Sequence, residues 1–339
     1  MDNQNISALV LAAGKGTRMK SGKAKVLHEV FFEPMINHVL DALKPLPLED
    51  VFIVTGHQRS AVEESLQNYN VSFIYQEEQL GTGHAVKIAE EPIRQSSGHV
   101  LILCGDTPLV RTKTLFEMLE SHLNSEAKLT IMTTEIENPT NYGRIVTDEN
   151  GHVMRIVEEK DASEKQKKLR EINAGIYFGA VDYIYDALTK VDTNNKQGEF
   201  YLTDIVEIAN NEGIAVNKYV CQDPLEVLGV NSRVELAEAH NILQERNNQE
   251  LMSSGVTIIH PETVSIEKTV IIGKDTCINP NVFISGTTKI GKGCTVEPFT
   301  IIKNCHLGDD VMVRGFSYLE NCMVSSNEKI DPRTTRMGK

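Results

Sequence analysis

An aliphatic residue recurs every six positions in the last third of the chain, and this repeat restricts the possible folds more than any other feature. The unbroken part of the series is Ile266, Ile272, Ile278, Ile284, Ile290, Val296 and Ile302. After shifts of one residue it continues through Leu307, Val313, Leu319, Val324 and Ile330. Antiparallel strands would give a period of two, whereas a period of six is typical of a parallel β-helix, in which equivalent residues stack from coil to coil. We therefore predict a short hexapeptide-repeat β-helix over residues 253–330, followed by a polar tail over 331–339.

Up to about residue 230 the chain alternates short apolar runs with helical stretches. The predicted strands are Ser7–Ala12, Asp50–Thr55, Val71–Tyr75, Val100–Cys104, Leu129–Thr134, Ile176–Phe178 and Ala215–Tyr219. The predicted helices are Met35–Leu43, Ala61–Gln67, Gly83–Glu90, Lys113–Leu123 and Asp182–Leu188. This alternation is typical of a mostly parallel α/β sheet with helices on both faces, whose ligands bind beyond the carboxyl ends of the strands. Residues 231–252 are predicted to form a connecting helix, with Ser232 and Glu235 as its capping box.

The composition limits the possible functions. Lys+Arg 34 against Asp+Glu 47 gives the 339 residues a net charge of -13, which excludes the broad basic surface of a nucleic-acid-binding protein. The apolar run from Ile6 to Ala13 stops at a glycine and is too short for a signal peptide or a membrane span. The 6 cysteines form no CxxC pair, so neither a zinc ribbon nor a redox motif is indicated. We expect a cytoplasmic protein of about two domains that meets any polyanionic substrate with a few local cations or a metal.

A glycine-rich segment follows the first predicted strand and carries two cations. Residues 11–19 read LAAGKGTRM and include Arg18, and Lys25 follows shortly after. The segment lacks the spacing of a P-loop, and Met19 stands where a dinucleotide fingerprint needs its third glycine. Small residues let backbone amides approach a phosphate, Arg18 can grip phosphate oxygens and Lys25 can supply a point charge. Taken alone, the segment is equally compatible with a plain turn, and each cation with an ordinary surface residue.

Further motifs occur in a fixed order along the chain. They are KVLH (25–28), Gln76, QLGTGHAV (79–86), CGDTPL (104–109), YGRIV (142–146), IVEEKDAS (156–163), EINAGIY (171–177), FYLTD (200–204) and GVNSR (229–233). With them and LAAGKGTRM, the chain resembles the bacterial N-acetylglucosamine-1-phosphate uridyltransferases. These are usually one half of a bifunctional enzyme whose other half is a glucosamine-1-phosphate acetyltransferase. The resemblance covers essentially the whole chain and implies a Rossmann-like nucleotidyltransferase domain over residues 1–230 with a left-handed parallel β-helix after it.

The resemblance also implies roles for individual residues. Those expected at the nucleotide are Leu11, Ala12, Ala13, Gly14, Lys25, Gln76, Gly81, Thr82, Cys104, Gly105 and Asp106. Those expected at the amino sugar are Gly143, Glu158, Asn173, Tyr201, Thr203 and Asn231. Asp106 and Asn231 are expected to hold Mg²⁺ together with the substrate's phosphates, and Arg18, Lys25 and Asp106 are the expected catalytic residues. Outside the family context, Asp106 would more readily form an Asx turn before Pro108, and the sugar-side residues would be surface or turn positions.

The implied reaction is uridylyl transfer from UTP to N-acetylglucosamine-1-phosphate, which gives UDP-N-acetylglucosamine and pyrophosphate for cell-wall precursor synthesis. Such transfer needs in-line positioning and charge neutralisation, so no side chain is expected to act as nucleophile. We expect a homotrimer formed through the β-helix, with no nucleic-acid or membrane partner. Because bifunctional relatives continue the β-helix for many more coils, acetyltransferase activity is expected to be absent. The alternatives are another sugar-1-phosphate nucleotidyltransferase and a noncatalytic scaffold that binds nucleotide sugars.

The chain departs from the family's pattern at four positions. Ala24 stands where a proline is usual, so the loop that carries Lys25 is expected to be looser. Cys104 replaces a common tyrosine, and Glu159 and Ala174 replace a common histidine and threonine. We expect altered affinities rather than loss of the reaction, and a buried, small-residue role for Cys104 rather than a catalytic one.

Overall fold

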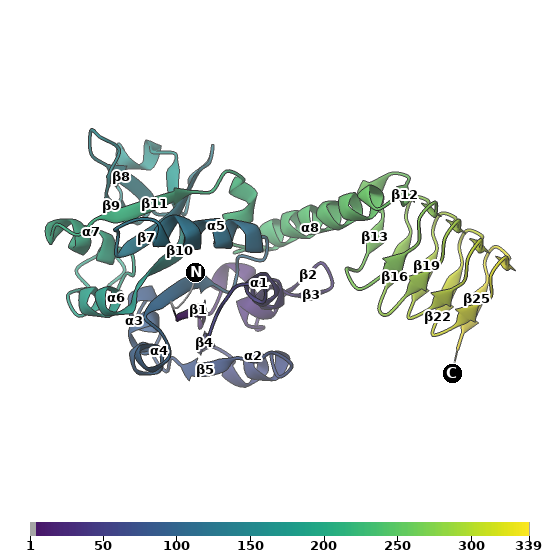
Figure 1. Cartoon of the computed structure of the whole chain (residues 1–339), viewed down its shortest axis with the longest axis horizontal. Coiled ribbons are helices and arrows are strands. Elements are labelled where there is room, and N and C mark those ends of the chain that lie inside the picture. Colours follow the sequence, from purple (N-terminus) through teal and green to yellow (C-terminus); the bar gives the residue numbers. More distant parts are fainter. Residues whose placement is uncertain (1–4, 339) are drawn as a thin grey trace. The chain divides into compact units, whose positions relative to one another are not determined.

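The computed structural model describes residues 5–338 and divides into two compact units, one ending at Glu235 and one beginning at Leu236. The first is an α/β unit, and the second contains most of helix α8 (Arg233–Ser253) and a solenoid of short strands (Figure 1). The division therefore falls within the first turn of α8, a few residues after the expected domain limit at 230. No helix among residues 5–338 is long and apolar enough to cross a membrane.

A nine-stranded sheet forms the centre of the first unit. Its main path runs in the order β11-β7-β10-β6-β1-β4-β5. These strands span, in that order, Val216–Val220, Leu129–Glu135, Glu171–Ala180, His99–Cys104, Ile6–Ala12, Val51–Thr55 and Ser72–Tyr75. The neighbouring pairs are parallel except those of β10, which runs antiparallel to both β6 and β7. The predicted mostly parallel sheet is confirmed.

Helices cover both faces of this sheet (Figure 1). Alternate residues of β1 belong to different hydrophobic clusters, Val10 to one and Leu9 to the other, so the strand is buried from both sides. The first cluster includes side chains of α1, α2 and α5, and the second includes those of α3, α4, α6 and α7. These helices span Met35–Leu43, Arg59–Ser65, Thr112–Leu123, Thr82–Lys87, Glu90–Ser96, Val181–Leu188 and Asp204–Asn211, in the same order. Burial on both faces explains why the strands are continuous apolar runs.

Several short elements of the first unit are absent from the sequence-based prediction. β8 (Arg144–Thr147) and β9 (Val153–Val157) form an antiparallel hairpin whose Arg144 stands opposite Ile172 of β10. A smaller hairpin joins β2 (Glu29–Val30) to β3 (Glu33–Pro34). Helices α4 and α7 are also missing from the prediction, because α4 contains a proline and neither helix is long enough to show an extended helical period.

The strands of the second unit stack in three parallel sheets. Their orders are β12-β15-β18-β21-β24, β13-β16-β19-β22-β25 and β14-β17-β20-β23. The strands from β12 to β24 are Thr257–Ile258, Ser265–Ile266, Ile271–Ile272, Cys277–Ile278, Phe283–Ser285, Lys289–Ile290, Thr295–Val296, Ile301–Lys303, His306–Leu307, Met312–Val313, Tyr318–Glu320, Met323–Val324 and Lys329–Ile330. Every aliphatic residue of the repeat is buried, and the register places Ile284 opposite Ile302 and Ile302 opposite Leu319. The predicted left-handed parallel β-helix is confirmed.

The segment expected to be a polar tail contains a further strand, so that expectation is wrong. β25 (Thr335–Met337) pairs with β22 and places Arg336 opposite Leu319, at the next inward position of the stack. Strand pairing uses backbone groups and tolerates a charged side chain whose donors find partners. Here the guanidinium of Arg336 donates to Glu328 at 2.8 Å and to the carbonyl oxygen of Met323 at 3.1 Å.

We expect Ile284→Ala to destabilise the second unit, because this side chain is fully buried between stacked coils. The truncation leaves a cavity, and the free energy of unfolding should fall by about 2–5 kcal/mol. Ile271→Ala removes the same atoms from a side chain that is 59% exposed, and it should change the free energy by less than about 0.5 kcal/mol. Chemical denaturation followed by circular dichroism compares the two variants, and equal losses would contradict the inward stacking of Ile284.

Candidate active site

The glycine-rich segment after β1 leads into two short 3₁₀ helices that carry the predicted cations. The first, Thr17–Met19, includes Arg18, and the second, Lys25–Leu27, begins with Lys25. Gly16 has a φ of +61°, and a Cβ atom at this position would lie 2.5 Å from the Cβ of Lys25. Glycine alone fits both the left-handed backbone and this close approach. Gly16 therefore allows the loop to lie directly against the stem of Lys25.

Arg18, Lys25, Asp106 and Asn231 meet at the carboxyl edge of the sheet. Asp106 follows β6, and its carbonyl oxygen accepts a hydrogen bond from the N–H of Val230 at 2.9 Å, which brings Asn231 alongside. The Oδ1 atom of Asn231 accepts hydrogen bonds from Lys25 Nζ at 2.6 Å and from Arg18 Nη2 at 2.8 Å. Lys25 also forms an ion pair with the carboxylate of Asp106. The structure thus brings together the residues predicted for phosphate and metal binding.

Asn231 is held in place by the residues that begin α8. Its Nδ2 donates to the carbonyl oxygen of Gly229 at 2.9 Å, and its backbone N–H donates to the carboxylate of Glu235 at 2.7 Å. The N–H of Glu235 donates in turn to the hydroxyl of Ser232 at 3.3 Å. The predicted capping box therefore forms with one change, since Glu235 reaches the N–H of Asn231 instead of that of Ser232. Asn231 therefore belongs both to the cap of α8 and to the candidate site.

A cavity of about 630 Å³ opens beside this group. Its walls include all residues predicted at the nucleotide except Gly105, namely Leu11, Ala12, Ala13, Gly14, Lys25, Gln76, Gly81, Thr82, Cys104 and Asp106. Gly105 adjoins the wall, because its N–H donates to the carbonyl oxygen of Leu11 at 2.9 Å. Thr17, Gln79 and Glu199 also line the cavity, although they are not among the residues predicted at the nucleotide. Thr17 lies in the motif LAAGKGTRM and Gln79 in QLGTGHAV, so their place in these motifs could have identified them.

The amide of Gln76 is buried and oriented by its neighbours. The residue is 3% exposed, and its Nε2 lies 2.9 Å from Nδ1 of His84 and 3.4 Å from the carbonyl oxygen of Gly81. The hydroxyl of Thr82 accepts a hydrogen bond from the N–H of Leu202 at 3.1 Å, which fixes the beginning of α3. A fixed amide presents a defined pattern of donor and acceptor atoms, and such a pattern can discriminate between base edges.

Most of the residues predicted at the amino sugar form a second cluster. The N–H of Asn173 donates to the carbonyl oxygen of Gly143 at 2.9 Å. A Cβ atom on Gly143 would lie 3.6 Å from both Glu158 Oε1 and the Cβ of Asn173, so the three residues adjoin. The hydroxyl of Thr203 donates to Glu158 Oε1 at 3.3 Å. Burial raises the pKa of Glu158, and the hydrogen bond from Thr203 partly opposes this rise.

Tyr201 lines an acidic cavity of about 380 Å³ together with Glu158, Asp161 and Asp204. Its hydroxyl donates to Asp161 at 3.2 Å and accepts from the amide of Gln197 at 2.8 Å, so both of its hydrogen-bonding roles are taken by protein groups. Burial raises the pKa of Asp204 to about 6, and neighbouring carboxylates add to the rise. The sixth residue predicted at the sugar, Asn231, lies with the cations instead.

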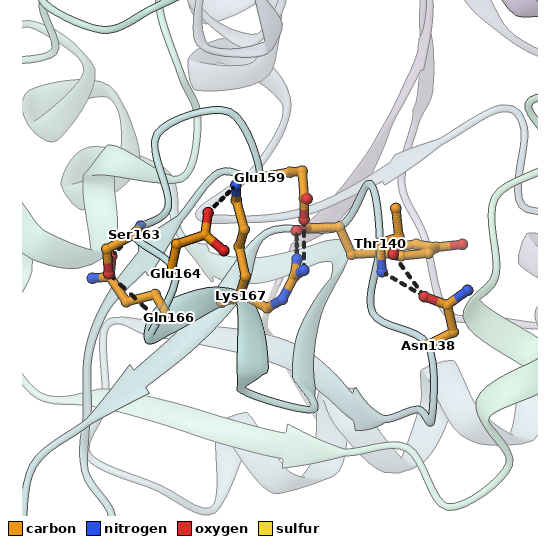
Figure 2. Close-up of polar contacts among 9 residues, drawn as sticks. Asn138, Thr140, Glu159, Ser163, Glu164, Gln166 and Lys167 are labelled. Atoms are coloured by element: carbon orange, nitrogen blue, oxygen red, sulfur yellow. Dashed lines mark hydrogen bonds and ion pairs between the residues drawn. The ribbon is translucent and has the colours of Figure 1, made fainter.

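A fully buried arginine supports the strands beside this cluster. Arg144 directly follows Gly143, and its guanidinium donates to Glu159 at 2.5 Å and to the carbonyl oxygen of Tyr142. Figure 2 shows Glu159 within a wider set of polar contacts that includes the ion pair between Glu164 and Lys167. A buried guanidinium requires a counter-ion. Glu159, which departs from the family's usual histidine, supplies it in this chain.

Cys104 lies at the end of β6 in the cavity wall. Burial, with a smaller contribution from Asp106, raises the pKa of this thiol to about 12. The nucleophilic form of cysteine is the thiolate, and at neutral pH this side chain remains a thiol. The side chain is half-buried rather than fully buried as expected, and it fits a small, non-nucleophilic role in the cavity wall.

Comparisons with known proteins agree with the geometry. A family model described as Nucleotidyl transferase matches residues 7–224. Proteins named Bifunctional protein GlmU are 47% identical in Desulfotalea psychrophila, over 96% of each chain, and 44% identical in Pelobacter propionicus, over 97% of this chain and 72% of that relative. A solved structure of a putative glucose-1-phosphate thymidylyltransferase from Bacillus anthracis shares the fold, with a TM-score of 0.55 and 20% identity over 70% of this chain and 94% of that one. The chain therefore belongs to the GlmU family and is a nucleotidyltransferase of the UDP-N-acetylglucosamine pyrophosphorylase type.

Proposed function

We propose that the chain transfers the uridylyl group of UTP to N-acetylglucosamine-1-phosphate, giving UDP-N-acetylglucosamine and pyrophosphate for cell-wall precursor synthesis. The proposal depends on one observation, the convergence of Arg18 and Lys25 with Asp106 and Asn231 beside the cavity of about 630 Å³. Nucleotidyl transfer demands positive charge around the reacting phosphates and little covalent help from the protein. This edge of the sheet offers that charge in a chain that is acidic overall.

In the proposed reaction a phosphate oxygen of N-acetylglucosamine-1-phosphate attacks the α-phosphorus of UTP. A new phosphorus–oxygen bond forms, the bond from the α-phosphorus to the bridging oxygen breaks, and pyrophosphate leaves with the electron pair. Arg18 grips non-bridging oxygens with its planar fork, and Lys25 neutralises charge that develops on the leaving group. No side chain becomes attached to the substrate, in keeping with the protonated state of Cys104.

We propose that Asp106 and Asn231 hold Mg²⁺. The ammonium of Lys25 touches one oxygen of each residue, so the two oxygens lie within reach of a single cation. Carboxylate and amide oxygens suit Mg²⁺, which usually keeps waters and takes further ligands from substrate phosphates. Among residues 5–338 there is no group of three or more His, Cys, Asp or Glu that could hold a metal, so phosphate oxygens and water must complete the shell. The bound ion would neutralise phosphate charge during transfer.

The remaining predicted residues fit the other parts of the two substrates. The backbone of residues 11–14, the oriented amide of Gln76, and Gly81 and Thr82 are proposed to bind the uridine, with Cys104 and Gly105 beside it. Gly143, Glu158, Asn173, Tyr201 and Thr203 are proposed to surround the amino sugar. A site that pairs with uracil's donor and acceptor atoms rejects other bases because a mismatch leaves buried polar groups unpaired.

Release of pyrophosphate over a panel of nucleoside triphosphates and sugar 1-phosphates tests this function. We expect turnover with UTP and N-acetylglucosamine-1-phosphate that requires Mg²⁺ and exceeds every other pair. Preference for another pair would favour a different sugar-1-phosphate nucleotidyltransferase, and no turnover with any pair would favour a noncatalytic scaffold. A parallel assay with acetyl-CoA and glucosamine-1-phosphate tests the expectation that this chain has no acetyltransferase activity, and measurable acetyl transfer would contradict it.

The metal assignment predicts that Mg²⁺ and nucleotide bind synergistically. Lys25 occupies the proposed metal ligands and must move when the ion binds, and a triphosphate offers it new partners. Measured with Mn²⁺ by electron paramagnetic resonance, UTP should tighten ion binding by about tenfold or more in the unaltered protein, which corresponds to a coupling free energy of about 1.4 kcal/mol. Lys25→Met should bind Mn²⁺ more tightly without nucleotide and gain less from UTP.

Lys15→Met is the matched control for this prediction, since Lys15 lines the same cavity and lies in the same loop. It removes an equal charge without removing a contact to Asp106. Asp106→Ala should lose both Mn²⁺ binding and turnover while the far-ultraviolet circular dichroism stays the same. Equal Mn²⁺ affinities in Lys25→Met and Lys15→Met would contradict direct occupation of the metal ligands by Lys25.

We also propose that the β-helix forms a homotrimer through the outer face of the sheet β13-β16-β19-β22-β25. Phe283, Ile301 and Tyr318 occupy stacked outward positions in this sheet. At a corner of the solenoid, the rings of Phe299 and Phe316 stack 5.0 Å apart and are 52% and 63% exposed. Exposed apolar surface of this kind is typical of contacts between protein chains.

Sedimentation velocity tests the trimer. Phe316→Glu places a charge on the proposed contact surface, so we expect a shift from trimer to monomer. Met323→Glu makes a comparable change at a side chain that is 76% exposed on a different sheet and should leave the trimer intact. A monomeric unaltered protein, or a trimer that survives Phe316→Glu, would contradict the proposal.

A further inference from the structure

Asn173 lies at an irregularity in the centre of the first unit's sheet. β10 pairs with β7 through Asn173 opposite Thr133 and resumes with Tyr177 opposite Ile131, so β10 carries extra residues between the two positions. Within this irregularity Gly175 has a φ of +72°, a left-handed backbone that favours glycine. The detour of the chain leaves Asn173 and Tyr177 close to each other on the same strand. The irregularity therefore positions one polar side chain against the other.

Both ends of the Asn173 amide are hydrogen-bonded inside this detour. Its Oδ1 accepts from the N–H of Gly175 at 3.1 Å, and its Nδ2 donates to the hydroxyl of Tyr177 at 2.7 Å. A backbone N–H can only donate, so the amide oxygen must face Gly175 and the amide nitrogen must face Tyr177. One amide proton and one oxygen lone pair remain available to another group. The N–H of Gly175 thus decides which end of the amide is the oxygen, and the hydroxyl of Tyr177 holds the nitrogen end in place.

We propose that Tyr177 is a positioning residue for sugar-phosphate binding, which acts by holding the Asn173 amide in one orientation. This inference rests on the proposed function, in which Asn173 contacts the amino-sugar substrate. Tyr177 itself is 2% exposed, so it acts through Asn173 rather than by contact with the substrate. Its hydroxyl is the single side-chain partner of the amide nitrogen among the described hydrogen bonds of Asn173.

The surroundings of Tyr177 keep its hydroxyl neutral. Burial raises its pKa well above the ordinary value, and the neighbouring carboxylate of Glu158 adds to the rise. The phenol is therefore an uncharged hydrogen-bonding group at neutral pH. The hydroxyl contacts Asn173, and Asn173 and Glu158 both adjoin Gly143, so it lies beside this part of the cluster proposed for the sugar.

Tyr177→Phe removes the hydroxyl and keeps the ring that fills the core. We expect the KM for N-acetylglucosamine-1-phosphate to rise about three- to tenfold, the factor that one net hydrogen bond contributes. The KM for UTP and kcat should stay within about twofold, because the ring is kept and the hydroxyl that is removed is hydrogen-bonded to Asn173, not to a residue proposed at the nucleotide. If the role of Tyr177 were purely structural, the substitution would lower the melting temperature but would not raise the KM for the sugar phosphate selectively over the KM for UTP.

Tyr183→Phe is the matched control, since it removes another buried tyrosine hydroxyl, one that donates to the carbonyl oxygen of Ile205 at 2.6 Å. It should lower the melting temperature by a similar amount and leave both KM values unchanged. In an Asn173→Ala background, Tyr177→Phe should have no further effect on the KM for the sugar phosphate, because the two residues act as one unit. Additive effects would overturn the proposed route through Asn173.

The outcomes separate this inference from the proposed function. If the unaltered protein does not turn over N-acetylglucosamine-1-phosphate with UTP, the proposed function fails and no KM for that sugar phosphate exists to compare. If the unaltered protein does so and Tyr177→Phe has the same KM values, the function stands and the positioning role of Tyr177 is wrong. A rise in the KM for UTP equal to that for the sugar phosphate would also overturn it, since it would indicate a general disturbance of the site.

Discussion

The balance of charge around Lys25 determines what the first unit can bind. A chain with a net charge of -13 repels a triphosphate on average, so its phosphate site depends on a few cations held close together. Cations held in this way repel one another unless acceptors separate them. Asp106 neutralises Lys25, and the amide oxygen of Asn231 accepts from both Lys25 and Arg18. The same oxygens suit a divalent ion, so the group that orders the cations is also the group that an ion and a nucleotide would rearrange.

This group forms because of the topology of the sheet. β1 and β6 are parallel neighbours, so the loop after β1 and Asp106 after β6 emerge at the same edge. The backbone contact between Asp106 and Val230 then brings Asn231 to them from a distant part of the sequence. A mostly parallel sheet was predictable from the alternation of apolar runs and helices, whereas the order of its strands and the antiparallel β10 were not. The contact with Asn231 was not, because no local pattern encodes a long-range hydrogen bond, and only the family resemblance linked the two residues.

The β-helix was the most predictable part of the fold, since the same side-chain contacts recur in each coil. Every inward aliphatic residue meets its equivalent in the next coil, and the period of six follows directly from this contact. The strand that contains Arg336 was not predictable in this way, because strand pairing continues there after the apolar pattern has ended. The β8–β9 hairpin could not be predicted from the sequence for a related reason. Arg144 occupies a buried strand position that an apolar residue would normally take, so its strand lacks a clear pattern.

The candidate site was predicted as a set of residues and not as a set of contacts. The motifs include Glu158 and Asn173, but the contacts that orient Asn173, with Gly175 and Tyr177, depend on an irregular strand that sequence periodicity does not reveal. The hydrogen bond from Thr203 to Glu158 joins two predicted residues that no local pattern pairs. Tyr201 also differs from the expectation. Its hydroxyl already donates to Asp161, so it is less available to a ligand than its place in the motif suggested.

The distribution of charge also favours one orientation of the proposed sugar phosphate in the site. Its phosphate is anionic, whereas its ring carries neutral hydroxyl and amide groups. Arg18 and Lys25 lie at one part of the site, and the carboxylates of Glu158 and Asp161 line the acidic cavity beside the sugar cluster. Carboxylates repel a phosphate and accept hydrogen bonds from hydroxyls, so the ring is favoured beside Glu158 and the phosphate beside the cations. Under the proposed reaction this orientation would direct the phosphate, rather than the ring, toward the triphosphate, and the acidic residues would help to align the attacking group.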